Sequence, residues 1–380
     1  MIHPFRIDVP DKTLEKIRTQ VADYPWHEMP DDGGWAYGTH LGYMKELCAY
    51  WVNEFDWRKQ EAAINRFSHF IAPVQGIDLH FIQEKGDGPS PLPLIISHGW
   101  PGSIVEFLDI IQPLAHPQRF GGSTDDAFDV IVPSLPGFGF SGRPGRPIGP
   151  RKMAELFNRL MIDVLGYSNY LAQGGDWGGA ISSWLGFEHA PACQAIHINI
   201  LTMRHPDGPH GPEEEAWAVQ FERDQLLEDG YRTQQATKPQ TLSYAMMDSP
   251  VGVAAWIIEK FNSWSDTDGD NIESAHTKDS LLTNIMVYLV TKTFNTASWI
   301  YYGRREEGGR LLSTDNRRVE VPTAAALFPA ELLAWPPRSY VERLYNITHW
   351  SEMPRGGHFA ALEEPELLID DIRAFARTLR

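Results

Sequence analysis

Short apolar runs bounded by turn residues fill the middle of the chain. They begin after Gln75-Gly76 and are separated by stretches with helical periodicity. Fully apolar runs that alternate with helices are typical of buried parallel strands. The pattern therefore predicts an α/β protein with a mostly parallel, doubly wound sheet. The five runs are IDLHFIQ (77–83), PLIISHG (93–99), DVIVPSLPG (129–137), NYLAQGG (169–175) and QAIHINI (194–200).

The strand-like runs stop between about residues 202 and 318. Long helical patterns replace them, for example at 250–264 and 280–302. Because sheet-forming runs flank this region on both sides, we expect 202–318 to form a helical lid that interrupts the core.

Strand-like runs resume after the lid, at VEVPTAAALF (319–328) and NITHWSEM (346–353), and a last amphipathic helix begins at Pro365. The core is thus predicted to consist of two parts, 71–201 and 319–380.

The first 70 residues differ from the core in pattern. Residues 1–70 are predicted to form a helical lead-in, with Asp11 opening a periodic segment that contains Leu14, Ile17 and Val21. Many aromatic residues follow, and they need a surface to pack on. We expect the lead-in to pack on the core and the lid.

Composition narrows the classes of partner. The chain has 380 residues, 42% of them hydrophobic, and a formal net charge of −17. Such a charge repels nucleic acid and anionic lipid unless a basic cluster overrides it, and no such cluster is present. Only two cysteines occur, Cys48 and Cys193, far apart and without metal-ligand spacing. No apolar stretch is long enough to span a membrane. We therefore expect a soluble, cytoplasmic protein.

A strand is expected to turn sharply into a helix within LAQGGDWGGA (171–180). Such a turn needs small residues on both sides of its apex, because the neighbouring elements approach closely. Gly174, Gly178 and Gly179 supply that room, and Asp176 stands at the apex. Hydrolases with a G-x-S-x-G pattern place a nucleophilic serine there. Asp176 is either a nucleophile or, as aspartates often are, a cap of the following helix.

The segment SHGWPGS (97–103) follows a predicted strand, where such hydrolases place the loop that stabilises an oxyanion. Its glycines and Pro101 are equally compatible with an ordinary turn. We call the sharp strand-to-helix turn at 171–180 the elbow. If it holds a nucleophile, the backbone N–H groups of Trp100 and Trp177 are expected to point at one oxygen.

His358 lies in a Gly-flanked turn just before the last helix, in RGGHFAALEEPE. Among 14 histidines most must be structural, but His358 comes last in the order nucleophile, acid, histidine that a triad on this kind of sheet follows. The acid is expected after the strand that follows the lid, where Glu331 stands. Asp315, Glu320 and Glu342 are competing carboxylates.

Several long segments resemble one family, the epoxide hydrolases of the microsomal type and their soluble bacterial and fungal relatives, which have the α/β-hydrolase fold. The likeness covers nearly the whole chain. The segments are PFRIDVPDKTLEKI, HGWPGS, PSLPGFGFSG, GGDWGG, DSPVGVAAWIIEKF, FPAELL and RGGHFAALEEPELL.

The resemblance implies a role for each member of the candidate triad. Asp176 is implied as the nucleophile, His358 as the base that activates water, and Glu331 as the acid that orients the histidine. A carboxylate suits this task because it is already ionised at neutral pH. It would open an epoxide to an alkyl ester, which water then hydrolyses to a vicinal diol.

The family also uses two lid tyrosines to hold and protonate the epoxide oxygen. Tyr231 and Tyr302 occupy the matching places, and the adjacent Tyr301 is an alternative for the second. No metal or organic cofactor is implied. The microsomal enzymes carry an N-terminal membrane anchor, whereas this chain begins almost directly with the lead-in, so membrane attachment is not expected.

The expected partners are water and a small apolar epoxide, and assembly into homo-oligomers is left open. Four lid aromatics hint at an apolar substrate, although helix packing explains them equally well. The acidic stretch SDTDGDNIES is predicted to be a solvated loop, because it lacks the glycine and the glutamate of a calcium-binding loop. The four aromatics are Trp217, Trp256, Phe261 and Trp264.

Two other functions are compatible with parts of the pattern. A haloalkane dehalogenase attacks carbon with an aspartate at the same elbow, and Trp177 could then hold the halide. The paired tyrosines favour the epoxide, because a departing halide needs no proton. A non-catalytic ligand-binding protein could keep the fold, but it would tolerate loss of the nucleophile or the histidine.

Overall fold

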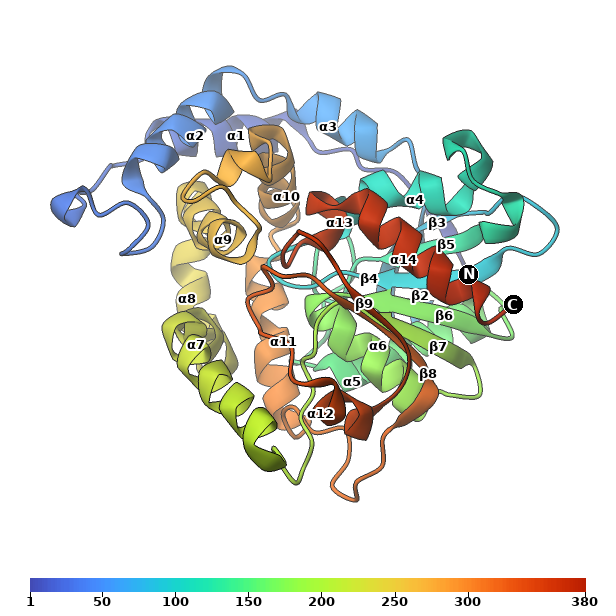
Figure 1. Ribbon diagram of the computed structural model, residues 1–380. Coiled ribbons are helices and arrows are strands. Elements are labelled where there is room, and N and C mark those ends of the chain that lie inside the picture. Colours follow the sequence, from blue (N-terminus) through green and yellow to red (C-terminus); the bar gives the residue numbers. More distant parts are fainter.

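One sheet of nine strands forms the centre of the molecule (Figure 1). The computed structural model describes residues 1–380 except for the side chain of Asp32. The strand order is β1-β2-β3-β5-β4-β6-β7-β8-β9. The strands are β1 (His3–Phe5), β2 (His69–Val74), β3 (Ile77–Glu84), β4 (Leu92–Ser97), β5 (Phe128–Pro133), β6 (Tyr170–Gly174), β7 (Cys193–Ile198), β8 (Val319–Leu327) and β9 (Tyr345–Glu352).

The six strands from β5 to β9 in this order pair in parallel, as the apolar runs predict. Each of the seven predicted runs overlaps one strand, from β3 to β9. The three strands at the other edge, β1, β2 and β3, pair antiparallel, and β3 pairs antiparallel with β5. The predicted mostly parallel α/β sheet is confirmed.

The sequence pattern does not predict β1 and β2. Strand β1 has three residues, too few for a period of two to show, and it lies within the lead-in that was expected to be helical. Strand β2 contains Pro73, a residue that sheets tolerate mainly near their edges. Phe5 pairs with His69, so the very start of the chain closes one edge of the core sheet.

Helices surround the sheet and form a second mass beside it. In Figure 1, α4 and α14 cover one face of the sheet, α5 and α6 cover the other, and α7 to α11 stand to one side. The helices are α1 (Asp11–Ala22), α2 (Leu41–Asn53), α3 (Trp57–Ile64), α4 (Leu108–Ala115), α5 (Pro150–Arg159), α6 (Asp176–Glu188), α7 (Gly211–Thr237), α8 (Pro239–Met246), α9 (Pro250–Trp264), α10 (Lys278–Thr291), α11 (Phe294–Glu306), α12 (Arg338–Leu344), α13 (Ala360–Glu363) and α14 (Pro365–Arg377).

Helices α7 to α11 lie between β7 and β8, in the region predicted as the lid. The helical pattern at 250–264 corresponds to α9. The pattern at 280–302 is divided between α10 and α11, because Lys292 takes a left-handed conformation (φ 56°) that ends α10. The limits of the four predicted segments of the chain stay a prediction.

The N-terminal helices brace the lid from outside. Helix α1 contacts α2, α9 and α10, and Figure 1 shows α1, α2 and α3 running along the top of the molecule. The hydroxyl of Tyr50 donates a hydrogen bond to Asp279 of α10 (2.9 Å), and the hydroxyl of Thr39 donates one to the carbonyl of Ala255 in α9 (2.6 Å). The lead-in thus fixes the lid helices against the core.

His98 ties together the loops that follow β4 and β5. Its Nε2 accepts a hydrogen bond from the N–H of Leu135 (3.2 Å), so its Nδ1 must carry the proton and donate to the carbonyl of Gly99 (2.9 Å). Burial lowers the pKa of His98 to about 4, although the Gly99 carbonyl and Asp176 oppose this shift. The neutral imidazole is therefore the form that the fold requires.

Replacing His98 by Gln should remove part of the pH dependence of stability. Below pH 6.5 the unfolded chain binds a proton at His98 that the folded chain refuses, so the stability of the wild type falls as the pH falls. Between pH 7 and 5 the unfolding free energy of the wild type should drop by about 2 kcal/mol relative to His98→Gln. Urea unfolding at several pH values measures this difference.

The exposed His27 provides the control for this measurement. The difference between the wild type and His27→Gln should stay constant over the same pH range. A constant difference for His98→Gln as well would contradict the assignment of a neutral, buried His98.

Candidate active site

The turn from β6 into α6 places Asp176 at a strained apex. Its φ of 43° lies in the left-handed region that residues with a Cβ seldom adopt. A Cβ on Gly178 would collide with the carbonyl of Ser97 at the end of β4, so only glycine lets the helix approach the sheet this closely. The N-cap of α6 is Gly175, and no side chain caps this helix. The alternative in which Asp176 serves as a helix cap is therefore wrong.

The carboxylate of Asp176 instead accepts a hydrogen bond from the loop after β4. The N–H of Trp100 donates to Oδ1 of Asp176 at 2.7 Å. A Cβ on Gly99 would collide with the same carboxylate. Trp177 lies in the first turn of α6, where N–H groups have no acceptor within the helix. The predicted loop and elbow thus meet at Asp176.

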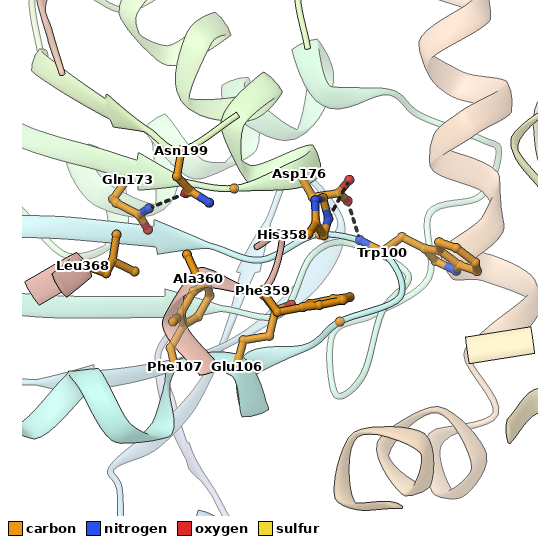
Figure 2. Close-up of a pocket in the computed structure, with 14 residues that line it drawn as sticks. Trp100, Glu106, Phe107, Gln173, Asp176, Asn199, His358, Phe359, Ala360 and Leu368 are labelled. Carbon is orange, nitrogen blue, oxygen red and sulfur yellow. Dashed lines mark hydrogen bonds and ion pairs between the residues drawn. The ribbon is translucent and has the colours of Figure 1, made fainter. Parts of the chain in front are cut away.

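His358 and Glu331 meet on the other side of the nucleophile. Glu331 follows β8, and His358 lies in the loop between β9 and α13. Nδ1 of His358 lies 2.8 Å from Oε1 of Glu331, and Nε2 lies 3.6 Å from Oδ2 of Asp176. Figure 2 shows Asp176 joined to both His358 and Trp100. The structure therefore brings together the three residues predicted as a triad.

The competing carboxylates lie on the surface and pair with arginines. Asp315 contacts Arg317, Glu320 contacts Arg318, and Glu342 contacts Arg338. All three side chains are exposed, whereas only 2% of the Glu331 side chain is exposed. Glu331 is the carboxylate among these four that contacts His358.

Two carboxylates set the charge of His358. Burial alone would lower the pKa of His358, but the charge of Glu331 and the nearby Asp176 raise it well above its usual value. The imidazole is therefore protonated at neutral pH. If Asp176 became an ester, one of the two negative charges would vanish, and the pKa of His358 would fall.

Two lid tyrosines reach the nucleophile from above the sheet. The ring of Tyr231, from α7, stacks on Trp100 with centroids 5.1 Å apart and an angle of 9°. The ring of Tyr301, from α11, packs edge-on against Trp177 at 4.7 Å, and the two tyrosine rings are 5.8 Å apart. Both line a cavity that also contains Asp176.

Tyr302 does not take the position predicted for it. Its ring lies under the guanidinium of Arg305, 5.8 Å away, and it does not line the cavity at Asp176 that the structure describes. Adjacent residues of a helix point about 100° apart, so Tyr301 and Tyr302 cannot both face this cavity. The structure corrects the second tyrosine from Tyr302 to Tyr301, the alternative that the sequence had left open.

Both cavity tyrosines are held in the protonated form. Burial raises the pKa of Tyr231 and of Tyr301, and the negative charge of Asp176 raises both further. A phenol that keeps its proton can donate a hydrogen bond to an oxygen bound beside Asp176.

A second, smaller cavity adjoins Asp176 and is lined by His358 (Figure 2). Its volume of about 10 Å³ suits a single water, which needs two or more polar partners. Three buried polar atoms around it have no hydrogen-bond partner among the described residues: Oε1 of Glu106, Oε1 of Gln173 and Nε2 of His358. This cavity can therefore place a water next to the histidine.

Sequence reasoning missed Glu106, which lines this cavity. Burial raises the pKa of Glu106 to about 8; His358 opposes this shift, and Asp176 adds to it. The side chain is therefore neutral at pH 7 and can donate a proton to a hydrogen bond. The sequence does carry a signal of a buried acid here, since Glu106 is the one acid in the apolar stretch IVEFL directly after HGWPGS.

The lid also holds the loop that carries His358. The N–H of His358 donates to the carbonyl of Trp264 (2.9 Å), and the N–H of Gly356 donates to Oδ2 of Asp266 (2.8 Å). Asp266 belongs to the acidic stretch predicted as a solvated loop. Across the described residues, no group of three His, Cys, Asp or Glu side chains is arranged to hold a metal ion.

Comparisons with known proteins agree with this geometry. The family model "Epoxide hydrolase N terminus" matches residues 2–107, and the model "alpha/beta hydrolase fold" matches residues 93–268. Epoxide hydrolase 1 of Sus scrofa is 34% identical, over 98% of this chain and 88% of its own length. The chain belongs to the epoxide hydrolase family.

Solved structures place this epoxide hydrolase beside enzymes of the same family. The Aspergillus niger epoxide hydrolase superposes with a TM-score of 0.88 at 28% identity and covers 100% of this chain and 97% of its own. The juvenile hormone epoxide hydrolase of the silkworm Bombyx mori superposes with a TM-score of 0.89, also at 28% identity, over 100% and 96% of the two chains. The predicted α/β-hydrolase fold and the predicted enzyme class are confirmed.

The described helices of this epoxide hydrolase include none with both the length and the apolar character needed to cross a membrane. Its two cysteines, Cys48 and Cys193, are buried and free.

Replacing Asp176 by Asn should lower the pKa of His358. The amide has the shape of the carboxylate but no charge, so it removes one of the two groups that hold the proton on the imidazole. Nitrogen NMR of the histidine side chains, recorded as a function of pH, measures the shift.

The exposed Asp109 offers a matched control. Asp109→Asn removes the same charge from the surface of α4 and should leave the titration of His358 unchanged. If Asp176→Asn also left it unchanged, the proposed coupling between the two residues would be refuted.

Proposed function

We propose that this epoxide hydrolase opens its substrate in two steps through an ester on Asp176. In the first step, a carboxylate oxygen of Asp176 attacks an epoxide carbon, and the carbon–oxygen bond of the ring breaks. The oxygen that leaves takes a proton from Tyr231 or Tyr301. The product is a hydroxyalkyl ester of Asp176.

In the second step, water attacks the carbonyl carbon of this ester. His358, no longer facing a charged Asp176, first gives its proton to the tyrosinate that the first step leaves. The neutral imidazole then takes a proton from the water, and Glu331 stabilises the imidazolium that forms. The N–H groups of Trp100 and Trp177 stabilise the oxyanion. The imidazolium then protonates the oxygen of the departing diol, which carries away one oxygen from Asp176. An oxygen from water takes its place in the carboxyl group, whose proton returns to His358.

We place the attacking water in the small cavity beside His358. Neither tyrosine lines this cavity, and His358 does not line the cavity of the tyrosines, so water and epoxide would occupy separate cavities next to Asp176. Neutral Glu106 and the amide oxygen of Gln173 supply partners for a water there. These partners would orient the water before the histidine takes its proton.

The observation that carries this proposal is the position of Asp176 between two sets of groups. Trp100 and His358 contact its two oxygens, and Tyr231 and Tyr301 line a cavity that adjoins it. Tyrosine hydroxyls are useful for protonating an alkoxide but unnecessary for a halide, so the geometry favours an epoxide over a haloalkane. A cytoplasmic location stays a prediction.

His358→Gln should trap the ester. Without a base for the water, the first step proceeds and the second stalls, so the protein gains the mass of one epoxide after mixing with styrene oxide. Asp176→Ala should form no such adduct. Intact-protein mass spectrometry measures both outcomes.

One turnover of the wild type in heavy-oxygen water should label the carboxylate of Asp176. Label found only in the diol would mean that water attacks the epoxide directly and would refute the ester. His27→Gln, at an exposed site, should behave as the wild type and controls for the handling of variants.

Tyr301→Phe and Tyr231→Phe should each slow formation of the ester roughly 100-fold, because each removes a hydroxyl that stabilises the leaving oxygen. Stopped-flow tryptophan fluorescence can follow this step, since Trp100 and Trp177 lie against the tyrosine rings.

Tyr302→Phe is the matched control, since it removes the same hydroxyl one residue along the helix. It should leave the rate of ester formation unchanged. A large effect of Tyr302→Phe with none for Tyr301→Phe would reverse the assignment made from the structure.

A further inference from the structure

Four arginines gather beside the nucleophile, and the mechanism proposed above uses none of them. Arg232, Arg304 and Arg310 line the same cavity as Asp176, which has a volume of about 40 Å³. Arg204 adjoins them, because its N–H donates to the carbonyl of Arg310 (2.9 Å). A chain with a net charge of −17 has thus collected cations at its active site.

Among the described residues, carboxylates leave most of these charges unbalanced. Arg232 pairs with Asp229. Within the part of the chain that the structure describes, Arg304 and Arg310 form no ion pair with a carboxylate. Their guanidinium groups lie over rings instead, that of Arg304 at 4.9 Å from the centre of a Trp177 ring. Of the residues described around the cavity, Asp176 is the one acid.

The surroundings disfavour the charge on these side chains. Burial lowers the pKa of Arg304 to about 10, and the neighbouring Arg232 and Arg204 lower it further. Burial and the other three arginines also lower the pKa of Arg310 well below its usual value. One buried guanidinium nitrogen of Arg204 has no hydrogen-bond partner among the described residues. Partly buried cations without a carboxylate partner cost stability, which a ligand of opposite charge would restore.

We propose that this cavity binds an anionic group of the substrate, so that the preferred epoxides carry a carboxylate close to the ring. A guanidinium offers two parallel N–H groups that match the two oxygens of a carboxylate. A volume of 40 Å³ is about what three waters need, which suits a carboxylate better than a larger phosphate ester. Asp176 and Tyr231 line the same cavity, so only a few atoms can separate the acid from the epoxide.

The arginines also reduce the electrostatic repulsion between such a substrate and Asp176. Without the arginines, the charge of Asp176 would repel the carboxylate of the substrate. This repulsion would slow the nucleophilic attack. The arginines that line the cavity attract the acid and offset this repulsion. The inference rests on the proposed function and refines the predicted apolar substrate: one end of the epoxide would be charged, and the other would face the aromatic lid.

The first test compares two substrates of nearly the same shape, 2,3-epoxybutanoate and its neutral amide, 2,3-epoxybutanamide. The wild type should convert the acid with a kcat/KM about tenfold higher or more, the factor expected from one charge-assisted hydrogen bond. Equal or better conversion of the amide would overturn the anion site. Styrene oxide serves as an uncharged reference.

Styrene oxide distinguishes a failure of the proposed anion site from a failure of the proposed epoxide hydrolase function. If styrene oxide is hydrolysed and 2,3-epoxybutanoate is not, the anion site is refuted and the epoxide hydrolase function stands. If none of the three compounds is converted, the proposed function fails, and the anion site fails with it.

The second test uses Arg304→Met and Arg310→Met, which keep the length of the side chain and remove its charge. Each should reduce the preference for acid over amide by about tenfold. Arg305→Met, one residue along α11 and exposed, is the matched control and should keep the preference of the wild type. If the Arg304 and Arg310 variants lost activity on both substrates while the ratio stayed constant, the arginines would be structural and the proposal would be wrong.

A measurement on the wild type alone covers the case in which these variants fail to fold. Butanoate should inhibit hydrolysis of styrene oxide competitively, and butanamide should inhibit it at least about tenfold less. Equal inhibition by the two compounds would overturn the anion site without any variant.

Discussion

The structure depends on the conformation of Asp176. Its left-handed backbone lifts the carboxylate above the carboxyl ends of the parallel strands, where it can meet groups from other loops. This conformation costs energy, and the neighbouring contacts maintain it. The N–H of Trp100 binds one oxygen, His358 faces the other, and Gly178 lets α6 pack onto β4 without a clash. A larger residue at Gly178 or Gly99 would displace the carboxylate.

Charge is distributed around Asp176 so that each group has the protonation state its proposed role requires. Glu331 and Asp176 together hold a proton on His358, while burial keeps Glu106 neutral on the same side of the nucleophile. On the other side, Tyr231 and Tyr301 keep their protons, and arginines collect around the cavity. Loss of the charge on Asp176 would lower the pKa of His358. The first proposed step would thereby prepare the histidine to act as a base in the second.

The lid supplies residues that line the site and residues that hold the loop of His358. Tyr231 and Tyr301 come from α7 and α11, and the carbonyl of Trp264 and the carboxylate of Asp266 hold the loop of His358. The lead-in helices hold the lid in turn, through contacts such as that of Tyr50 with Asp279. Segments far apart in the sequence therefore meet at one site: the lead-in holds the lid, and the lid holds the loop of His358.

The sequence by itself determined the order of the elements and singled out Asp176 as the proposed nucleophile. Apolar runs showed β3 to β9, the glycines around Asp176 showed the elbow, and chain order selected His358 and Glu331. These features are local, or follow from a chain order that the fold imposes. The edge strands β1 and β2 were not found, because a three-residue strand and a strand with a proline carry little periodic signal.

Only the tertiary structure decided which side chains share the cavity. Tyr301 and Tyr302 are equivalent in sequence, and the rotation of α11 against Trp177 selects Tyr301. Glu106 and the arginines looked like ordinary charged residues, since burial and the absence of partners arise from segments that meet in space. Periodicity reports which face of an element is apolar, but not which other element that face will contact. The packing of the lid on the core settles that contact, and with it the set of residues around Asp176.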